Sequence, residues 1–270
     1  MLTENSLFTL WSAEQTLANT HGRNGVYKLS PDVIDYEMQF YHSDTELRLS
    51  MLTQEGLEHF VSAYGATYQV LYLDYCSYIR DFSPLGDLKN IEAVKIEWCR
   101  NIDKLWDMTN NSRLRVLSIH EAKKLVSNPM QLQTSRTLEE IRLWGTMDNK
   151  YTLDSLSCFR GMTSLKRIDL NQIKLKNRNF DILSTLPQLE EFHFDAGMLS
   201  TEEIAWICAK YPNLYGSCLG VYTTDEFGCW NDIRICGYRK PGLDLPKDQK
   251  RLERYTDEFQ SLLEKYRNEP

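Results

Sequence analysis

The chain has 270 residues, of which 42% are hydrophobic and 26% charged, so its composition is that of a folded protein and not of a disordered one. Its formal net charge of −7, from 38 acidic and 31 basic residues, lacks the basic excess that phosphate backbones attract, which argues against nucleic acid as a partner. No stretch reaches the roughly 20 apolar residues of a membrane span, and the first residues lack the charge pattern of a secretory signal. We therefore expect a cytoplasmic protein that makes no contact with a membrane.

The seven cysteines are an odd number without a paired Cys-x-x-Cys arrangement, which favours reduced thiols over a disulfide framework. Cys218, Cys229 and Cys236 follow one another closely, so a metal or redox site there is an alternative. Zinc, however, needs four ligands, and no nearby histidine completes the set. We expect no metal and no other cofactor.

Residues 1–67 are expected to cover the first unit of the array described below, as a cap made of a helix, a β-hairpin and a second helix. Ser12 and Gln15 have the spacing of a capping box, which predicts a short helix. Apolar and polar residues alternate over 33–40, which predicts a strand, and 45–52 would form a hairpin with it.

The second helix of this cap is predicted just before the array begins. Thr53 is a suitable N-cap residue, and Gly65 is a suitable end. Leu57, Phe60 and Tyr64 would share one face of this helix.

One apolar pattern recurs from Tyr68 to Leu219: a large apolar residue, two variable ones, an apolar one, a variable one and an apolar one, with Ser217 of the last copy as the one exception. The first positions of successive copies are separated by 23, 23, 24, 27, 24 and 25 residues, and a period of this size is typical of repeat proteins. The copies are Tyr68/Leu71/Leu73, Ile91/Val94/Ile96, Leu114/Leu117/Ile119, Leu138/Ile141/Leu143, Leu165/Ile168/Leu170, Leu189/Phe192/Phe194 and Leu214/Ser217/Leu219.

Three positions beyond the last apolar residue, the first two copies carry Cys76 and Cys99. The pattern resembles that of the leucine-rich repeat family, in which Asn or Cys is typical at this position. The resemblance implies an α/β leucine-rich repeat solenoid, a right-handed superhelix of β/α units, with a parallel sheet on its concave face over residues 68–237. Later copies depart from the family pattern and indicate an irregular array, with Ala122, Thr146, Ile173 and Gly197 at this position.

The segments that follow the strands differ in length. Residues 83–90 and 105–113 are too short for more than one or two turns, which predicts 3₁₀ segments. The 27-residue spacing leaves room for a longer helix over 153–162, and 179–187 and 200–212 are predicted helices, the latter with a capping box.

Residues 230–235 are expected to form one last strand, and the Pro- and Gly-containing segment 239–246 reads as a linker. An amphipathic helix is predicted over 247–266, so that residues 238–270 form a C-terminal unit. This helix would cap the array or, alternatively, bind a partner or a second copy; we expect a monomer or a weak homodimer.

Because successive side chains of a strand point to opposite faces, the residues between the inward apolar positions should lie on the concave face. Large aromatic residues and Arg are enriched at binding hot spots, and Tyr72, Tyr75, Trp98, Arg142 and Trp144 are expected there as anchors. The expected partner-binding residues are Tyr72, Asp74, Tyr75, Lys95, Glu97, Trp98, His120, Arg142, Trp144, Asp169, Asn171, His193 and Asp195.

We therefore expect a non-enzymatic module for protein–protein interaction, since the sequence motifs of phosphate-binding, esterase and metalloprotease sites are missing. A bacterial immunity or inhibitor protein that neutralises a basic toxin or effector is a special case. One alternative is a self-associating structural protein. A weaker one is a metal-dependent hydrolase at His193, Asp195 and Asp169.

Overall fold

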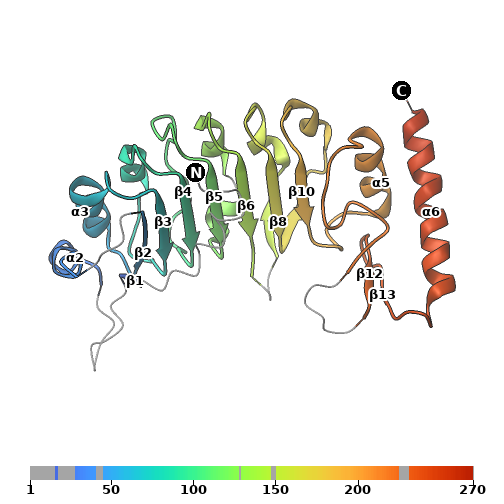
Figure 1. Cartoon of the computed structure of the whole chain (residues 1–270), viewed down its shortest axis with the longest axis horizontal. Helices are drawn as coiled ribbons and strands as arrows, with labels where there is room; N and C mark the ends of the chain where they lie inside the picture. Colours follow the sequence, from blue (N-terminus) through green and yellow to red (C-terminus); the bar gives the residue numbers. More distant parts are fainter. Residues whose placement is uncertain are drawn as a thin grey trace.

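The computed structural model describes residues 16–17, 28–40, 45–127, 129–146, 150–224 and 231–269. Within them the chain is an α/β protein built on an eight-stranded parallel sheet of order β1-β2-β3-β4-β5-β6-β8-β10 (Figure 1). The predicted α/β class with a parallel sheet is thus confirmed. The strands are β1 (Thr16–Leu17), β2 (Glu46–Ser50), β3 (Val70–Asp74), β4 (Ala93–Glu97), β5 (Val116–His120), β6 (Glu140–Trp144), β8 (Arg167–Asn171) and β10 (Glu191–Phe194).

Helical segments connect most of these strands and lie together on one side of the row of strands (Figure 1). The connection between β3 and β4 contains a 3₁₀ helix, as predicted for 83–90. The 3₁₀ segment predicted over 105–113 is wrong, because that segment holds only turns and irregular backbone. The helices are α2 (Pro31–Met38), α3 (Gln54–Tyr64), α4 (Lys123–Ser127), α5 (Thr201–Lys210) and α6 (Gln249–Asn268), with the 3₁₀ helices η1 (Ser83–Asp87), η2 (Met130–Thr134), η3 (Leu156–Phe159) and η4 (Asp181–Thr185).

The core lies between the sheet and the helical segments. The two inward positions of each strand form two continuous apolar rows, because neighbouring strands pair in register. Their side chains are all buried: Leu47, Leu71, Val94, Leu117, Ile141, Ile168 and Phe192 in one row, and Leu49, Leu73, Ile96, Ile119, Leu143, Leu170 and Phe194 in the other. We call the opposite face of the sheet the outer face.

Most strands of the main sheet are directly followed by a residue with left-handed backbone. Tyr75, Trp98 and Glu121 have φ of 51°, 56° and 51°, a region that L-residues seldom adopt. The N–H of each donates to the carbonyl of the last residue in the next strand, at 3.1 Å for Tyr75, 3.3 Å for Trp98 and 3.1 Å for Glu121. This turn brings the chain back to the core, where Cys76 and Cys99 are fully buried.

Cys76 and Cys99 act as small buried side chains between neighbouring units. Cys76 Sγ lies 3.4 Å from the carbonyl oxygen of Leu49, and Cys99 Sγ lies 3.9 Å from that of Leu73, so each thiol contacts the preceding strand. Burial raises the pKa of Cys76 well above its usual range. The six cysteines in the described part of the chain are free thiols.

The predicted hairpin near the N-terminus is wrong. Residues 31–38 form helix α2, which begins at Pro31 after the extended Ser30, and Ile34 is buried. Its carboxylate Asp35 accepts hydrogen bonds from His59 and Tyr64 of α3, so α2 is fixed against that helix.

The strand predicted over 45–52 does exist as β2, but it pairs parallel with β1 and β3 and so extends the main sheet. Thr16–Leu17, where a helix was expected, form β1; the remainder of that predicted helix lies outside the described residues. The helix after Thr53 is confirmed, since the Thr53 hydroxyl accepts from the N–H of Gly56 at 3.0 Å and Gly65 ends it.

The longer helix predicted over 153–162 is wrong. That segment holds only the 3₁₀ helix η3, and the extra length of this unit forms strand β7 (Tyr151–Leu153), which pairs parallel with β9 (Ile173–Leu175). The helix predicted over 179–187 is likewise the 3₁₀ helix η4, whereas α5 is present with its capping box between Ser200 and Glu203.

The C-terminal part departs from the main sheet. The copy at 214–219 forms a single bridge, between Tyr215 and Glu191, in place of a strand. The strand expected near residue 233 exists as β12 (Ile233–Ile235), but it lies in a separate antiparallel sheet with β11 (Tyr222–Thr223) and β13 (Gly242–Leu243). Residue Trp230 lies outside the described residues.

Helix α6 packs against α5 at the end of the molecule (Figure 1). Phe259 and Leu263 are 5% and 8% exposed there, and Lys210 Nζ donates to the Glu269 carbonyl at 2.7 Å. None of the helices in the described ranges is long and apolar enough to cross a membrane.

One buried polar side chain joins neighbouring units and offers a test of the packing. Asn111 is 1% exposed; its amide donates to the carbonyls of Leu85 and Leu88, both at 2.9 Å, and accepts from Trp106 Nε1 at 2.7 Å. The substitution Asn111→Ala leaves the carbonyls of Leu85 and Leu88 and the indole N–H of Trp106 without the Asn111 amide as a hydrogen-bond partner. We expect it to lower the free energy of unfolding by about 2–4 kcal/mol in urea titrations.

The matched control is Asn90→Ala, which removes a surface hydrogen bond of 2.7 Å to the Ala66 carbonyl and should lower the same free energy by less than about 1 kcal/mol. Equal losses in the two variants would contradict the structural role assigned to Asn111.

Candidate functional site

The predicted site residues lie on the outer face and along the edge where the strands end. Register pairs Tyr72 with Lys95 and Arg142 with Asp169, which in turn pairs with His193. A second row, two positions later in each strand, contains Asp74, Glu97, His120, Trp144 and Asn171. Tyr75 and Trp98 directly follow β3 and β4, and Asp195 directly follows β10. The structure therefore brings the predicted site residues together on one face and one edge of the sheet.

Tyr72 lies inside this face and is only 7% exposed. The Arg48 guanidinium and Lys95 Nζ lie 4.5 Å and 4.4 Å from the centroid of its ring, and its hydroxyl donates to Glu97. Burial, followed by the hydrogen bond to Glu97, raises the pKa of Tyr72 far above its usual range. The ring is thus already sandwiched between two cations of its own chain.

Asp74 is the other strongly buried member of the set, at 2% exposure, and it forms an ion pair with Arg48. Burial raises the pKa of Asp74, although Arg48 opposes this shift. Tyr72 and Asp74 therefore hold neighbouring strands together on this face and offer little surface to a partner.

Glu97 is a shared acceptor at the centre of the outer face. Its carboxylate lies 3.0 Å from Lys95 Nζ and 3.9 Å from His120 Nδ1, besides accepting from Tyr72. Burial opposes ionisation, but the hydrogen bonds from Tyr72 and Lys95 outweigh it and lower the pKa of Glu97. Burial, together with the charge of Lys95, lowers the pKa of His120 to about 4, so its imidazole is neutral at pH 7.

Two stacked aromatic pairs lie at the edge where the strands end, Tyr75 with Trp98 just after β3 and β4 and His120 with Trp144 at the last positions of β5 and β6. The rings of Tyr75 and Trp98 are nearly parallel, at 3°, with centroids 5.6 Å apart, and the Arg100 guanidinium lies 4.8 Å above Trp98. The rings of His120 and Trp144 stack at 4.4 Å and 7°. Tyr75 is 49% exposed, so the first pair faces solvent.

Trp144 also connects this edge to the next part of the face. Its indole N–H donates to Asp169 Oδ1 at 3.1 Å. Burial raises the pKa of Asp169, while the nearby charge of Arg142 opposes the shift. Arg142 itself donates to Glu140 at 2.9 Å, and burial lowers its pKa.

The three groups of the hydrolase hypothesis bind different partners. His193 Nε2 lies 2.8 Å from Glu191, whereas Asp195 accepts from the Gln172 N–H at 2.9 Å and lies 3.5 Å from Lys150 Nζ. Asp169 faces Trp144, as described above. Among the described residues there is no group of three or more His, Cys, Asp or Glu side chains that could hold a metal ion.

Asn171 and Asp195 line a hollow of about 390 Å³ beyond the end of β10, together with Lys150, Cys218 and Arg234. This hollow lies between the main sheet and the segment that leads to the antiparallel sheet. Asn171 and Asp195 belong to the predicted partner-binding residues, whereas Lys150, Cys218 and Arg234 do not. Cys218 is buried there, at 3% exposure.

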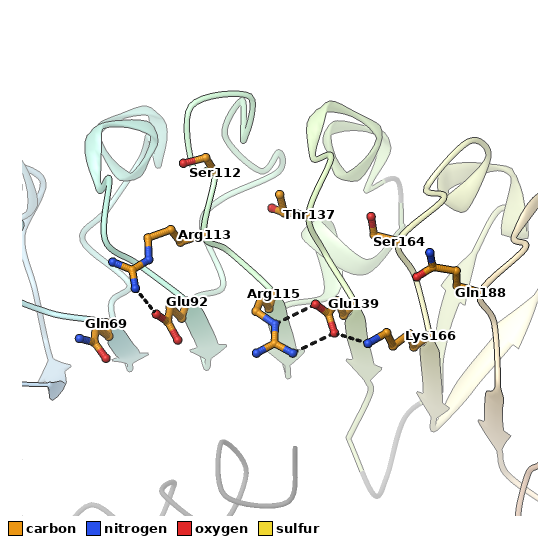
Figure 2. Close-up of a pocket in the computed structure, with 10 residues that line it drawn as sticks. All are labelled: Gln69, Glu92, Ser112, Arg113, Arg115, Thr137, Glu139, Ser164, Lys166 and Gln188. Carbon is orange, nitrogen blue, oxygen red and sulfur yellow. Dashed lines mark hydrogen bonds and ion pairs between the residues drawn. The ribbon is translucent and has the colours of Figure 1, made fainter. Parts of the chain in front are cut away.

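Another hollow, of about 670 Å³, lies at the opposite edge of the sheet, where the strands begin (Figure 2). Arg115 donates two hydrogen bonds to Glu139, at 2.8 Å and 2.9 Å, and Lys166 Nζ lies 2.9 Å from the same carboxylate. Arg113 pairs with Glu92 at 2.9 Å. Arg115 and then Lys166 hold the pKa of Glu139 below its usual range, although burial opposes them.

Sequence reasoning missed this hollow because it considered only residues within and after the strands. A signal was present: the residues just before β4, β5, β6 and β8 alternate in charge, as Glu92, Arg115, Glu139 and Lys166. Figure 2 shows Ser112, Thr137 and Ser164 along the same edge. The hollow has a polar lining, and its two acidic residues, Glu92 and Glu139, are already in ion pairs. This favours a structural role for both acids.

Comparison with known proteins finds no protein-family model that matches this chain and no curated protein that matches it.

The neutral state of His120 gives a pH prediction with a defined sign. Since its pKa is lower in the folded chain than its usual 6.5, the unfolded chain takes up the proton first as the pH falls. Stability present at pH 7 is therefore lost progressively between about pH 6.5 and about pH 4, by at most about 3 kcal/mol.

Urea unfolding of the wild type and of His120→Gln, measured from pH 7 to pH 4, isolates this contribution because the other titrating groups are common to both proteins. We expect the stability of the wild type relative to the variant to fall as the pH falls. A difference that stays constant across this range would show that His120 is not held neutral.

Proposed function

We propose that this protein is a leucine-rich repeat solenoid that binds a protein partner on the outer face of its sheet and at the edge where the strands end, without catalysis. The sevenfold apolar pattern, the buried Cys76 and Cys99 and the in-register parallel strands all support the repeat assignment. Repeat proteins of this kind present one long face that the fold leaves free for recognition.

The exposed stack of Tyr75 on Trp98 is the observation that carries the proposal. Both rings are large, and their stacking together with the Arg100 guanidinium limits the conformations that they can adopt. A rigid aromatic surface loses little conformational entropy on binding, which is why aromatic residues and Arg dominate binding hot spots. Trp144, stacked on His120 two strands further on, would extend the same contact.

The size of the face is consistent with such an interface. Eight strands at about 4.8 Å spacing and about 16 Å length give a sheet face on the order of 600 Å². A standard interface takes about 800 Å² from each partner, so the loops after the strands, including Arg100, would also contribute.

The charges on the face indicate what kind of partner would fit. Glu97 and Asp74 are paired with Lys95 and Arg48, and Asp195 is near Lys150, so the acids are largely compensated. We therefore assign affinity to the aromatic pairs and specificity to the mixed charges. An inhibitor or immunity protein that neutralises a toxin, acting in the cytoplasm where free thiols stay reduced, is the special case that we favour.

A capture experiment tests the proposal. Tagged wild-type protein, the double variant Trp98→Ala/Trp144→Ala and the control Tyr36→Ala would be incubated in extract of the source organism, followed by quantitative mass spectrometry. The control removes a ring that is 60% exposed but lies on α2, away from the outer face. We expect a stoichiometric partner that is retained by the control and reduced at least about tenfold in the double variant.

Thermal melting of the three proteins would show that the variants remain folded. Equal recovery of the partner by the wild type and the double variant would contradict the placement of the site. Turnover of a substrate by the purified protein, lost in the same variant, would contradict the non-enzymatic proposal.

The self-association alternative is less well supported, because the apolar residues Phe259 and Leu263 of α6 are already buried against its own chain. Removal of residues 246–270 should therefore expose α5 and lower the midpoint of thermal unfolding. We expect light scattering to report the same monomeric mass for the full chain and the truncated chain at low concentration. An oligomer of the full chain that dissociates on truncation would favour assembly instead.

A further inference from the structure

A hollow of about 380 Å³ lies at the C-terminal end of the molecule, between η4, α5 and α6 and apart from the proposed partner-binding face. Three aromatic side chains from these three elements line it: Phe180, which precedes η4, Trp206 of α5 and Tyr266 of α6. Asp181, Glu202 and Glu203 add three carboxylates to its lining, and Arg178 adds one guanidinium. Nothing in the proposed function uses this site.

The aromatic walls are held by contacts outside the hollow. The rings of Phe180 and Trp206 lie 6.5 Å apart at an angle of 42°, and Tyr211 packs edge-on against Trp206 at 6.1 Å. Phe180 is 5% exposed, whereas Trp206 and Tyr266 are half-buried. Packing of α6 on α5 fixes the distance between the two half-buried rings, so the hollow does not depend on a flexible loop.

The charge of the lining is not balanced. Glu203 pairs with Arg178 at 2.8 Å and closes the capping box of α5. Asp181 and Glu202 are exposed, and in the part of the chain that the structure describes neither forms an ion pair. The lining therefore carries three carboxylates against the one guanidinium of Arg178, which is paired with Glu203, so among the described residues Asp181 and Glu202 are left without an ion-pair partner.

Aromatic faces attract cations through their quadrupole, and this attraction is strongest for cations that shed water easily. A primary ammonium group is strongly hydrated, whereas a quaternary ammonium group spreads its charge over methyl groups that also suit an apolar wall. Tyr266 already takes part in one such contact, since Lys265 Nζ, which is not among the residues that line the hollow, lies 4.8 Å from the centroid of its ring.

We propose that the hollow formed by Phe180, Trp206 and Tyr266, with Asp181 and Glu202 at its rim, binds a quaternary ammonium group. The group could belong to a small choline-type molecule or to a trimethylated lysine of a protein; the chemistry of recognition is the same.

Nuclear magnetic resonance of the ¹⁵N-labelled full chain tests the proposal directly. The chain has six tryptophans, and the indole signal of Trp206 is the one that disappears in Trp206→Phe. Choline and its neutral carbon isostere, 3,3-dimethylbutan-1-ol, would be titrated separately. We expect choline to shift the Trp206 signal saturably and to bind at least about tenfold more tightly than the isostere, because only choline carries the charge.

Paired variants distinguish the contribution of the Tyr266 ring to binding from that of its hydroxyl and from effects on folding. Tyr266→Phe keeps the aromatic face and should bind choline with less than about a twofold change, whereas Tyr266→Leu should weaken binding about tenfold. Asp181→Asn/Glu202→Gln should weaken choline but not the isostere. The midpoint of thermal unfolding would show that each variant is folded.

Two further arms distinguish the source of the cation and the independence of the site. A short peptide with trimethyllysine that binds at least tenfold more tightly than choline, and more tightly than the same peptide with unmodified lysine, would assign the site to a protein partner. The variant Trp98→Ala/Trp144→Ala should bind choline as the wild type does, since it changes the other site.

Equal affinity for choline and the neutral isostere would reduce the hollow to an apolar depression and overturn the proposal. The absence of any shift of the Trp206 signal at about 0.1 M choline would overturn it as well, because a cage of this kind should be at least partly occupied at that concentration.

Discussion

The register between neighbouring parallel strands is the constraint on which the rest of the molecule depends. Each strand carries two inward apolar side chains, and a single unit is too small to bury them. They become fully buried only because Leu71 lies beside Val94 and Leu73 beside Ile96, and so on along the sheet. A shift by one residue would turn every apolar side chain outward. The same register therefore sets the position of every residue on the outer face.

Charges on the outer face are arranged so that the chain satisfies most of them itself. Arg48 pairs with Asp74 on the next strand, and Arg167 of β8 reaches Glu140 at 3.2 Å on β6 and Glu191 at 2.9 Å on β10. Such pairs stabilise little when exposed, but they remove the long-range field that steers a charged partner. Recognition on this face should therefore depend on shape and on aromatic contacts. At the C-terminal hollow, by contrast, Asp181 and Glu202 form no ion pair among the described residues, so their charge remains available to a cationic ligand.

The strands and their inner rows could be predicted because a period of two within each strand and a spacing of 23 to 27 residues leave few alternatives. The segment that forms α2 could not, since Ile34 and Met38 fit a strand face and a helix face equally well, and the contacts of Asp35 with α3 decide between them. The pairing of β12 with β11 and β13 could not be predicted either, because it depends on which strands lie beside β12 in the folded chain. The burial of Tyr72 depends on Arg48, which lies in a strand that the pattern assigned to a hairpin.

The choice of side chains after β3 and β4 is the strongest sign that the fold alone does not explain this surface. The left-handed position is required by the turn, and Glu121 and Gln172 fill it in other units, so the turn does not require an aromatic ring. Tyr75 nevertheless leaves about half of its surface in water, where a smaller polar side chain would serve the turn equally well. A ring that neither the core nor the backbone needs is the observation that favours the proposed contact with another molecule.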